Sequence, residues 1–545
     1  MRTYFVFLLF VFSAGQAQDL IPLAPNSSGL HQQYIGKIVF SEKALAKESM
    51  NKEDFLKQYT LTPKSDLFFT AFFANSVTNV KHTLAPELNT DSLFKTGNYQ
   101  FTLFVDGKEI YRSNLRPGAP LPAQQDTVRI LHRPFIDNMH GQGSWSESFW
   151  MRFMNVGGAK VLTDGQHQLK MEIRAYVNSG SIKTSEIMAV GELPITVALH
   201  PMIDIQNVEL HRPKSYPGLP VSTESYDTVK LKQLKGSIDT GLFKKITSIV
   251  VVRDGKILFE EYFNGANRNT LHDTRSVGKS FASTLTGMAI ADGYLPSEQI
   301  TLGKIYPIDN YKNYSVEKSA TTVRDLLTMA SGFDGDDGVD SSPGNEENMY
   351  PSDNWVKFAL DLPFDTSYKK KWHYFTAGVV ILGDVLQRRV KGGLETYASE
   401  RLFKPLGIEE YQWEYTPQKV PNTAGGLRLR ALDLAKYGLL YQQDGRWNGK
   451  QILTKDWIQK TFTPYHTLPG RTGEFYGYLF WNKTFTVNGK SHVVNYCSGN
   501  GGNYVMIFKD QPLVIVVTAN AYGQSYAHVQ VQRMVIEYLI PALIR

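Results

Sequence analysis

Cysteine is almost absent from the sequence: Cys497 is the single one in 545 residues, so no disulfide can form within one chain. The chain also lacks a large excess of either positive or negative charge. The chain has 58 Lys and Arg residues against 52 Asp and Glu residues, a net charge of +6. So small an excess gives no reason to expect a nucleic acid partner. With 42% hydrophobic and 20% charged residues, the composition is globular, and the length predicts two or three domains.

Long apolar runs are lacking too. No segment reaches the length of about 18 apolar residues that a membrane-spanning helix needs, so no stable membrane insertion is expected. A shorter run stands at the start, in MRTYFVFLLFVFSAGQAQD, after Arg2 and before small residues that end at Ala17. This is typical of a secretory signal peptide, residues 1–17, cleaved after Ala17. No cysteine follows it for lipid attachment. An exported chain without disulfides indicates a secreted or bacterial periplasmic protein.

The residues from 18 to 205 show a β pattern. The stretch YQFTLFVDGKEIYRS alternates apolar and polar residues around Asp106-Gly107, which is typical of a β-hairpin turn. We expect a β-sandwich domain with a structural or binding role. One amphipathic helix, SMNKEDFLKQY, is predicted near residue 50. Four further segments have strand length: DLFFTAFFANS, SESFWMRFM, HQLKMEIRAYV and AVGELPITVAL.

A polar, proline-bearing stretch follows and indicates an inter-domain linker over residues 206–234. The pattern then changes over residues 235–545. A second hairpin turn is predicted at Asp254-Gly255, helical periodicity dominates from 276 to about 445, and strands return in NYVMIF and LVIVVTA. The last segment, YAHVQVQRMVIEYLI, is predicted as an amphipathic helix. This order predicts an α+β, multidomain protein whose second domain has an antiparallel sheet flanked by helices.

The stretch TRSVGKSFAS carries two motifs at once. Gly278-Lys279-Ser280 is similar to the end of a phosphate-binding loop, but Asp273 stands where that loop needs its first glycine, so we disfavour phosphate binding. Ser276 precedes Lys279 by three residues, and both share one face of a helix. The helix N-terminus favours a developing oxyanion and a neutral amine. The alternative interpretation is an N-cap serine and a surface lysine.

Five downstream segments favour the interpretation of Ser276 and Lys279 as a catalytic pair. They are TVRDLLTMASGFD, WHYFTAGVVILGDVL, LFKPLGIEEYQW, TAGGLRLRALDLAKYGLLYQQDGRWNGKQIL and YCSGNGGNYVMIF. Together with S-x-x-K they resemble the serine β-lactamase and penicillin-binding protein superfamily, and most of all its class C-like branch with carboxylesterases, D-aminopeptidases and nylon-oligomer hydrolases. The resemblance covers residues 235–545. It implies a β-lactamase-like domain, with an antiparallel sheet flanked by helices and an all-helical subdomain.

The resemblance implies a catalytic set. Ser276 of SVGK is the nucleophile that forms an acyl-enzyme, and Lys279 acts as a base. Tyr374 of HYFT matches the tyrosine of the family's Y-x-N motif and would relay protons with Lys279. The alternative for Tyr374 is a core aromatic beside Trp372 and Phe375. No cofactor is implied, and the sequence has no HExxH or comparable metal motif.

A glycine-rich stretch matches the family's Lys-[Thr/Ser]-Gly strand, which lines the substrate cleft. We expect Asn500, Gly501 and Gly502 to occupy this place, with the backbone N–H of Asn503 joining that of Ser276 as the oxyanion hole. Cys497-Ser498-Gly499 is an alternative register, and a plain glycine-rich turn is a further alternative.

Two departures from the family pattern bear on the substrate. Thr376, a tentative substrate-binding residue, stands where the family usually has Asn, and the strand motif lacks its leading lysine. Both changes remove contacts that recognise acylaminocarboxylates, so an ester or amide substrate is favoured over β-lactams. Arg428 or Arg430 could supply a substitute cation, or both could lie on the surface.

The predicted function is therefore that of a serine hydrolase, carboxylesterase- or amidase-like, acting on a small-molecule ester or amide or a short peptide. The alternatives are a penicillin-binding D-Ala carboxypeptidase or β-lactamase, and a catalytically weak envelope sensor or binding protein. Under each of these functions, the β-sandwich could contact an envelope glycan or protein.

Overall fold

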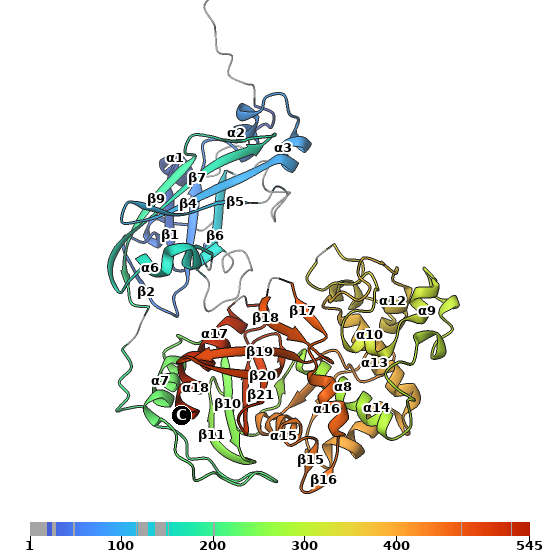
Figure 1. The fold of residues 1–545 in the computed structure, drawn as a ribbon. Helices are drawn as coiled ribbons and strands as arrows, with labels where there is room; N and C mark the ends of the chain where they lie inside the picture. Colours follow the sequence, from blue (N-terminus) through green and yellow to red (C-terminus); the bar gives the residue numbers. More distant parts are fainter. Residues whose placement is uncertain are drawn as a thin grey trace, which may run out of the picture. The chain divides into compact units, whose positions relative to one another are not determined.

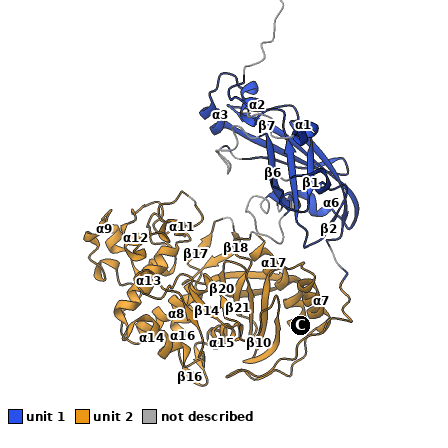
Figure 2. Cartoon of the chain, turned by 180° about the vertical axis from the view of Figure 1, so that it is seen from behind, with its two compact units in different colours: residues 1–202 blue, residues 203–545 orange. Residues whose placement is uncertain are grey.

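A computed structural model describes residues 19–23, 29–46, 50–115, 117, 129–136, 149–150, 152–199, 202–339, 341–469, 471–524 and 526–544. The signal peptide predicted for residues 1–17 lies outside these residues. The chain divides into two compact units, residues 1–202 and 203–545 (Figure 2). Each unit has a hydrophobic core of its own.

The first unit is built from two β-sheets. One has the strand order β1-β3-β6, and the other has the order β2-β9-β7-β4-β5, with β8 pairing β7. Buried side chains from both sheets, such as Phe69 and Phe101, belong to one core, as expected for a sandwich. The strands are β1 (Ile38–Ser41), β2 (Tyr59–Leu61), β3 (Leu67–Phe72), β4 (Gly97–Val105), β5 (Lys108–Asn114), β6 (Ile130–Ile136), β7 (Gly165–Asn178), β8 (Ile182–Thr184) and β9 (Ala189–Val197).

The first predicted hairpin is confirmed. Strands β4 and β5 pair antiparallel across Asp106 and Gly107, whose φ angles are 50° and 78°. Positive φ at both turn residues matches the right-handed twist of the flanking strands, and Asp-Gly tolerates it at low cost.

Two local predictions in this unit are wrong. The segment SESFWMRFM was expected as a strand, but its described residues are helical and continue into a π-helical turn, η2 (Met154–Gly158). Phe149 and Phe153, four residues apart, are both buried, which is a helical and not a strand period. The helix expected near residue 50 is a single 3-10 turn, η1 (Lys52–Asp54), because Tyr59 already enters β2.

Short helices in the first unit escaped the sequence analysis. Helix α2 begins after Ser76 and α3 begins after Asn89, and each of these side chains accepts a hydrogen bond from the backbone N–H three residues on. These are ordinary N-cap signals in helices too short for a clear apolar period. The described helices are α1 (Gly29–Tyr34), α2 (Val77–Leu84), α3 (Thr90–Thr96) and α6 (Ala159–Val161).

The second unit centres on one antiparallel sheet in the order β11-β10-β22-β21-β20-β19-β18-β17 (Figure 1). Strand β10 pairs with β22, so segments near residues 250 and 515 lie side by side in the sheet, next to its edge strand β11. The predicted hairpin at Asp254-Gly255 joins β10 to β11. The strands are β10 (Ile246–Arg253), β11 (Lys256–Tyr262), β17 (His466–Leu468), β18 (Arg471–Tyr476), β19 (Trp481–Val487), β20 (Lys490–Gly499), β21 (Asn503–Phe508) and β22 (Leu513–Ala519).

Helices flank this sheet, and α9 to α14 gather beyond one end of it as a helical subdomain (Figure 1). The α+β, multidomain fold predicted from the sequence is therefore confirmed. The helices are α7 (Thr228–Asp239), α8 (Val277–Ala291), α9 (Val316–Ala320), α10 (Val323–Leu327), α11 (Glu346–Met349), α12 (Trp355–Asp361), α13 (Thr376–Arg389), α14 (Gly393–Ala398), α15 (Ala431–Gln442), α16 (Lys455–Phe462), α17 (Ala527–Met534) and α18 (Ile540–Leu543).

Short elements complete the second unit. A small sheet in the order β12-β14-β13 lies next to the start of α8, and β15 pairs with β16. The short strands are β12 (His272–Asp273), β13 (Gln412–Trp413), β14 (Leu427–Leu429), β15 (Arg446–Trp447) and β16 (Lys450–Gln451). The 3-10 and π-helical turns are η3 (Leu302–Lys304), η4 (Ile308–Asn310), η5 (Ser399–Phe403) and η6 (Val535–Leu539).

The segment expected as a linker is packed against the second unit from residue 211 onward. Glu261 on β11 is fully buried, and its carboxylate makes two hydrogen bonds of 2.6 Å to His211. One is accepted from the backbone N–H of His211, and the other joins the carboxylate to Nδ1 of the His211 ring. The backbone N–H of Ser222 donates to the carbonyl oxygen of Ile257, also on β11, at 2.8 Å. Helix α7 then starts at Thr228. These hydrogen bonds hold the segment extended along β11.

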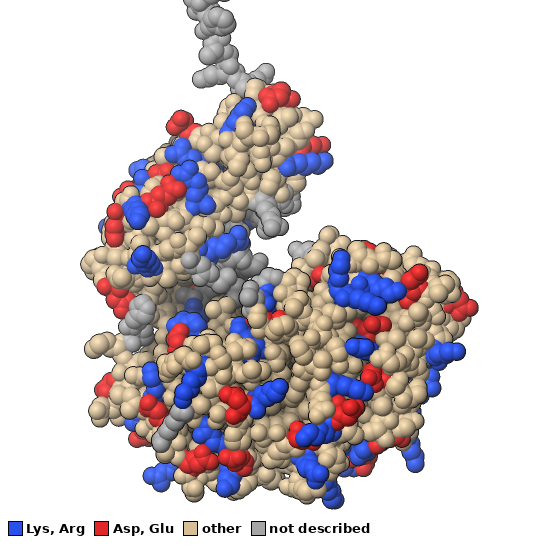
Figure 3. Space-filling view, viewed as in Figure 1, with Lys and Arg blue, Asp and Glu red and all other residues tan. Residues whose placement is uncertain are grey.

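The charged side chains on the face seen in Figure 3 are of both signs and interspersed over the second unit. This agrees with the near balance of 58 basic and 52 acidic residues in the sequence. Among the described residues, no helix has the length and apolar character needed to cross a membrane.

Candidate active site

The site begins at Ser276, which occupies the N-cap position of α8. Its side chain makes no capping hydrogen bond, so the hydroxyl is not used to close the helix end. The turn before it is tightly held: Thr274 donates its hydroxyl to the carbonyl of Leu427 at 2.7 Å. Arg275 adopts a left-handed conformation with φ of 49°, which is uncommon outside glycine. Such strain beside a serine is typical of functional sites.

Lys279 lies one turn further along α8, and its side chain is only 2% exposed. Its Nζ donates to Oγ of Ser276 at 2.9 Å and to the carbonyl oxygen of Ala424 at 2.7 Å. The i,i+3 spacing of the two residues on one helix makes this contact. The alternative interpretation of a surface lysine does not fit a side chain this deeply buried.

Tyr374 lies two residues before α13 and near the lysine. The Nζ of Lys279 is 5.1 Å from the centre of the Tyr374 ring. The ring is half-buried and stacks on Trp481, with ring centres 6.0 Å apart, and it also contacts Trp372. The structure thus places Tyr374 in an aromatic cluster and beside Lys279 at once, so both of its predicted environments are present.

Thr376 begins α13, two residues after Tyr374. Its side chain is 1% exposed, and its backbone N–H donates to Oδ2 of Asp337 at 2.8 Å. A side chain this deeply buried contributes little surface to a substrate cleft.

Asp337 is a residue that the sequence analysis missed. Its backbone N–H donates to the carbonyl of Tyr374 at 2.8 Å, and its Oδ1 accepts from the N–H of Glu346 at 2.9 Å. Burial raises the pKa of Asp337, while its hydrogen bonds with Thr376 and the charge of Lys279 act in the opposite direction. The available signal was the acidic run DGDDG that follows the RDLLTMASG segment.

The glycine-rich stretch is split between a strand and a turn. Gly499 ends β20, and a Cβ built on it would lie 2.1 Å from the carbonyl oxygen of Thr274 and 3.0 Å from the backbone nitrogen of Ser276. Only glycine fits so close to that backbone. The strand therefore meets the serine at Gly499.

The four residues predicted to line the site lie just beyond this contact. Asn500, Gly501 and Gly502 form the turn from β20 to β21, and the two glycines have φ of 91° and 93°. Asn503 is the first residue of β21 and is 1% exposed, and its side chain bonds Asn500 and Ala519. The structure brings Gly499, and not Asn503, against Ser276.

One edge of β20 is open next to this contact. Strand β19 pairs with β20 only as far as Tyr496, so residues 497–499 have no strand partner on that side among the described residues. The carbonyl of Gly499 accepts from the N–H of Gly502, which points it toward β21. Because backbone groups alternate along a strand, those of Ser498 point to the open edge. The N–H of Asn500 points the same way, because it lies opposite the Gly499 carbonyl across a trans peptide bond.

Cys497 stands on β20 in the position that the alternative register gives to the family's lysine. The thiol is fully buried, and burial raises the pKa of Cys497 to about 12. A buried, protonated thiol is not a nucleophile at neutral pH.

The two arginines considered as substitute cations both lie in ion pairs. Arg428 pairs with Glu414 at 3.0 Å and is 3.8 Å from Asp273. Arg430 pairs with Glu410. Neither arginine contacts the Ser276 hydroxyl.

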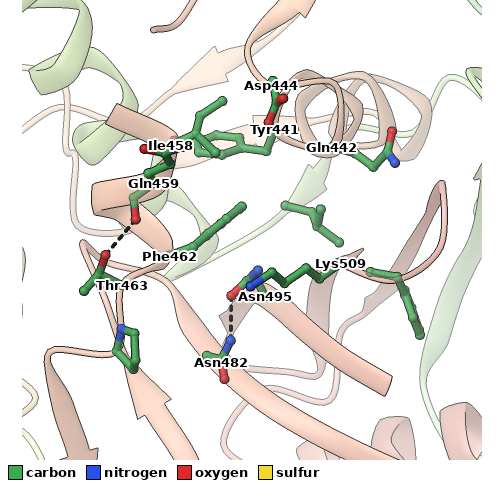
Figure 4. A pocket seen from close by; sticks show the side chains of 13 residues that line it. Tyr441, Gln442, Asp444, Ile458, Gln459, Phe462, Thr463, Asn482, Asn495 and Lys509 are labelled. Carbon is green, nitrogen blue, oxygen red and sulfur yellow. Dashed lines mark hydrogen bonds between the residues drawn. The ribbon is translucent and has the colours of Figure 1, made fainter. Parts of the chain in front are cut away.

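A separate pocket of about 400 Å³ opens on the second unit, between α15, α16 and strands β19 to β21 (Figure 4). Its wall includes Phe462 and Ile458, and its polar groups include a cross-strand amide pair in which Asn482 donates to Asn495 at 2.7 Å. None of the predicted site residues lines this pocket. Within the described ranges, no group of three or more His, Cys, Asp or Glu side chains is arranged to hold a metal ion.

Comparison with known proteins points to one family. The beta-lactamase family model matches residues 246–534. No curated protein matches the chain.

Solved structures are similar to a little over half of the chain. EstCE1, a hydrolase with promiscuous acyltransferase activity, shares 15% identity with a TM-score of 0.46, covering 57% of this chain and 98% of that one. A D-stereospecific amidohydrolase from Streptomyces sp. shares 16% identity with a TM-score of 0.42, covering 53% and 94%. A class C beta-lactamase shares 15% identity with a TM-score of 0.44, covering 58% and 96%.

Proposed function

Since the chain belongs to the beta-lactamase family, a family of serine hydrolases, we propose that it cleaves an ester or amide through an acyl-enzyme formed on Ser276. The observation that carries the proposal is the 2.9 Å contact between the Lys279 amine and the Ser276 hydroxyl, made by an amine that is 2% exposed. An amine at this distance is within hydrogen-bond reach of the proton that the serine must lose.

Tyr374 completes the catalytic set in this proposal. Its ring centre is 5.1 Å from the amine, so we assign the proton transfers of the reaction to the phenol and the amine as a pair. When Ser276 attacks the substrate carbonyl, its proton passes to this pair, and the pair returns a proton to the leaving group. Water then repeats the sequence on the acyl-enzyme with the same groups.

The oxyanion hole is assigned to two backbone donors. The N–H of Ser276 lies at the helix N-terminus, where the dipole favours negative charge. The second donor is the N–H of Asn500, which lies opposite the Gly499 carbonyl across a trans peptide bond and so points to the open edge. This replaces Asn503 in that role, because Asn503 lies inside the sheet with its side chain bonded to β22.

The open edge of β20 at residues 497–499 supports an extended substrate. A short peptide or an amide chain can pair with the backbone groups of Ser498 there, as an added strand. The fully buried Cys497 thiol provides no cation for a substrate carboxylate. This favours esters and amides over β-lactams and D-Ala peptides, which the family binds through that carboxylate.

We also propose export, on the basis of the N-terminal apolar run, and a binding role for the β-sandwich toward an envelope glycan or protein. Both rest on the sequence pattern and the fold class alone.

The proposal is tested by labelling the full chain with a fluorophosphonate and reading the intact mass. One label is expected on the wild type and none on Ser276→Ala. A panel of p-nitrophenyl esters, amides, β-lactams and D-Ala peptides then assigns the substrate class. A chain that is not labelled at all would identify a sensor or binding protein, and release of D-Ala would identify a carboxypeptidase.

A further inference from the structure

The Tyr374 phenol has no helix or strand of its own to hold it, since it precedes α13 in an irregular segment. We propose that Asp337 is the positioning residue of this reaction, which holds Tyr374 against Lys279 by fixing the two peptide groups that follow Tyr374. The inference rests on the proposed function and adds a residue to it.

Asp337 is tied to the segment at two points. Its own N–H donates to the carbonyl of Tyr374, and its Oδ2 accepts from the N–H of Thr376, both at 2.8 Å. These bonds hold the two successive peptide groups that follow Tyr374, on either side of Phe375. Both groups are thereby fixed to one residue, through its backbone N–H and its carboxylate, so the backbone that carries the phenol cannot move away from the lysine without breaking a hydrogen bond.

The carboxylate is itself anchored from a third direction. Its Oδ1 accepts from the N–H of Glu346, which starts α11 after Asn345. An ionised carboxylate accepts at both oxygens at once, whereas the amide of Asn can accept at only one. Holding Thr376 and Glu346 together therefore requires Asp at this position.

The charge of Asp337 also acts on the catalytic pair. Lys279 on α8 faces it with positive charge, while Glu346 on α11 and Tyr350 just after that helix are its other charged or titratable neighbours. The charges of Asp337 and Lys279 attract each other. Removing the carboxylate charge should therefore move the acid limb of the reaction to lower pH.

Three variants separate these effects, with rates normalised to the fraction labelled by fluorophosphonate. Asp337→Ala should lower kcat about 10- to 100-fold with KM within threefold, because a displacement of the phenol near 1 Å costs rates of this order. Asp337→Asn should move the acid limb of the kcat/KM profile about one pH unit downward. Asp337→Glu should restore the wild-type position of that limb, since it restores the charge.

Asp336→Asn is the matched control, since the neighbouring carboxylate bonds His373 and the N–H of Gly338 instead of the backbone at Tyr374. It should shift the limb by less than about a third of a pH unit. Normalised kcat within threefold of wild type in Asp337→Ala, or an unmoved acid limb in Asp337→Asn, would overturn the proposal. A purely structural Asp337 would lower the labelled fraction and the melting temperature without moving the limb. Wild-type protein that is neither labelled nor active would instead refute the proposed hydrolase function.

Discussion

Gly499 and Ser276 meet backbone to backbone: a Cβ on the glycine would lie 3.0 Å from the serine nitrogen. The contact joins the end of a sheet strand to the start of a helix more than 200 residues earlier in the chain. It brings the helix N-terminus with its serine, and the open edge of the strand, to one point. The predictions below test this arrangement and the side chains around it.

Replacing Gly499 with Ala should lower kcat at least about 100-fold. The added methyl group would lie 2.1 Å from the carbonyl oxygen of Thr274, so the strand must move away from Ser276 and the oxyanion donors separate. Steady-state kinetics with an ester substrate measures the effect. Gly278→Ala is the matched control in the same site, because its nearest new contact is at 3.5 Å and Ala favours the helix. Equal rates for the two variants would contradict the assignment of β20.

Ser276→Ala should abolish turnover of p-nitrophenyl esters. The control is Ser283→Ala on the same helix, whose hydroxyl is buried and makes no hydrogen bond within the described residues. Because that hydroxyl gains nothing in the fold, its removal should leave kcat unchanged and raise the unfolding free energy by about 1 kcal/mol. Residual activity above a few per cent in Ser276→Ala would exclude the serine as nucleophile.

Tyr374→Phe should lower kcat by about two to four orders of magnitude, since the phenol hydroxyl is lost while the ring still packs on Trp481. Melting temperatures should therefore stay close to that of the wild type. Tyr496→Phe, in the same aromatic cluster, is the control and should change kcat by less than threefold. If the two variants behave alike, the phenol has no role in proton transfer.

Acid should destabilise the second unit through two buried histidines. Burial lowers the pKa of His272 and of His528 to about 4 from the usual value of 6.5. Between pH 6.5 and 4 the unfolded chain binds more protons than the folded one, so the unfolding free energy falls as pH falls, by at most about 3 kcal/mol for each histidine. Above pH 6.5 both states are neutral at these positions and no dependence is expected from them.

Thermal unfolding of the wild type and of His272→Asn, followed across this pH range by loss of fluorophosphonate labelling, checks the effect. The variant should show a smaller loss of stability between pH 6.5 and 4. The same pH dependence in both proteins would mean that His272 is not held neutral in the fold.

Much of the fold follows from local signals. The hairpins at Asp106-Gly107 and Asp254-Gly255 form because these dipeptides accept positive φ at low cost, whatever the rest of the chain does. Lys279 meets Ser276 because residues three apart on a helix share a face. These relationships span a few residues, so the amino-acid sequence alone was enough to predict them.

Other features depend on distant segments. The helix at Phe149 and Phe153 was mistaken for a strand because an aromatic run of this length fits either period until its burial is known. Asp337 is one of several acidic residues in a loop, and only the folded chain shows which carboxylate reaches Thr376 and Glu346.

The sequence by itself determined which side chains could carry the chemistry, because a serine and a lysine one helical turn apart need no tertiary partner to meet. The tertiary structure alone decided which glycine touches the serine and which backbone N–H groups face the substrate edge. These depend on the register of β20 against β19 and β21, and strand register is set by pairing and packing between distant segments.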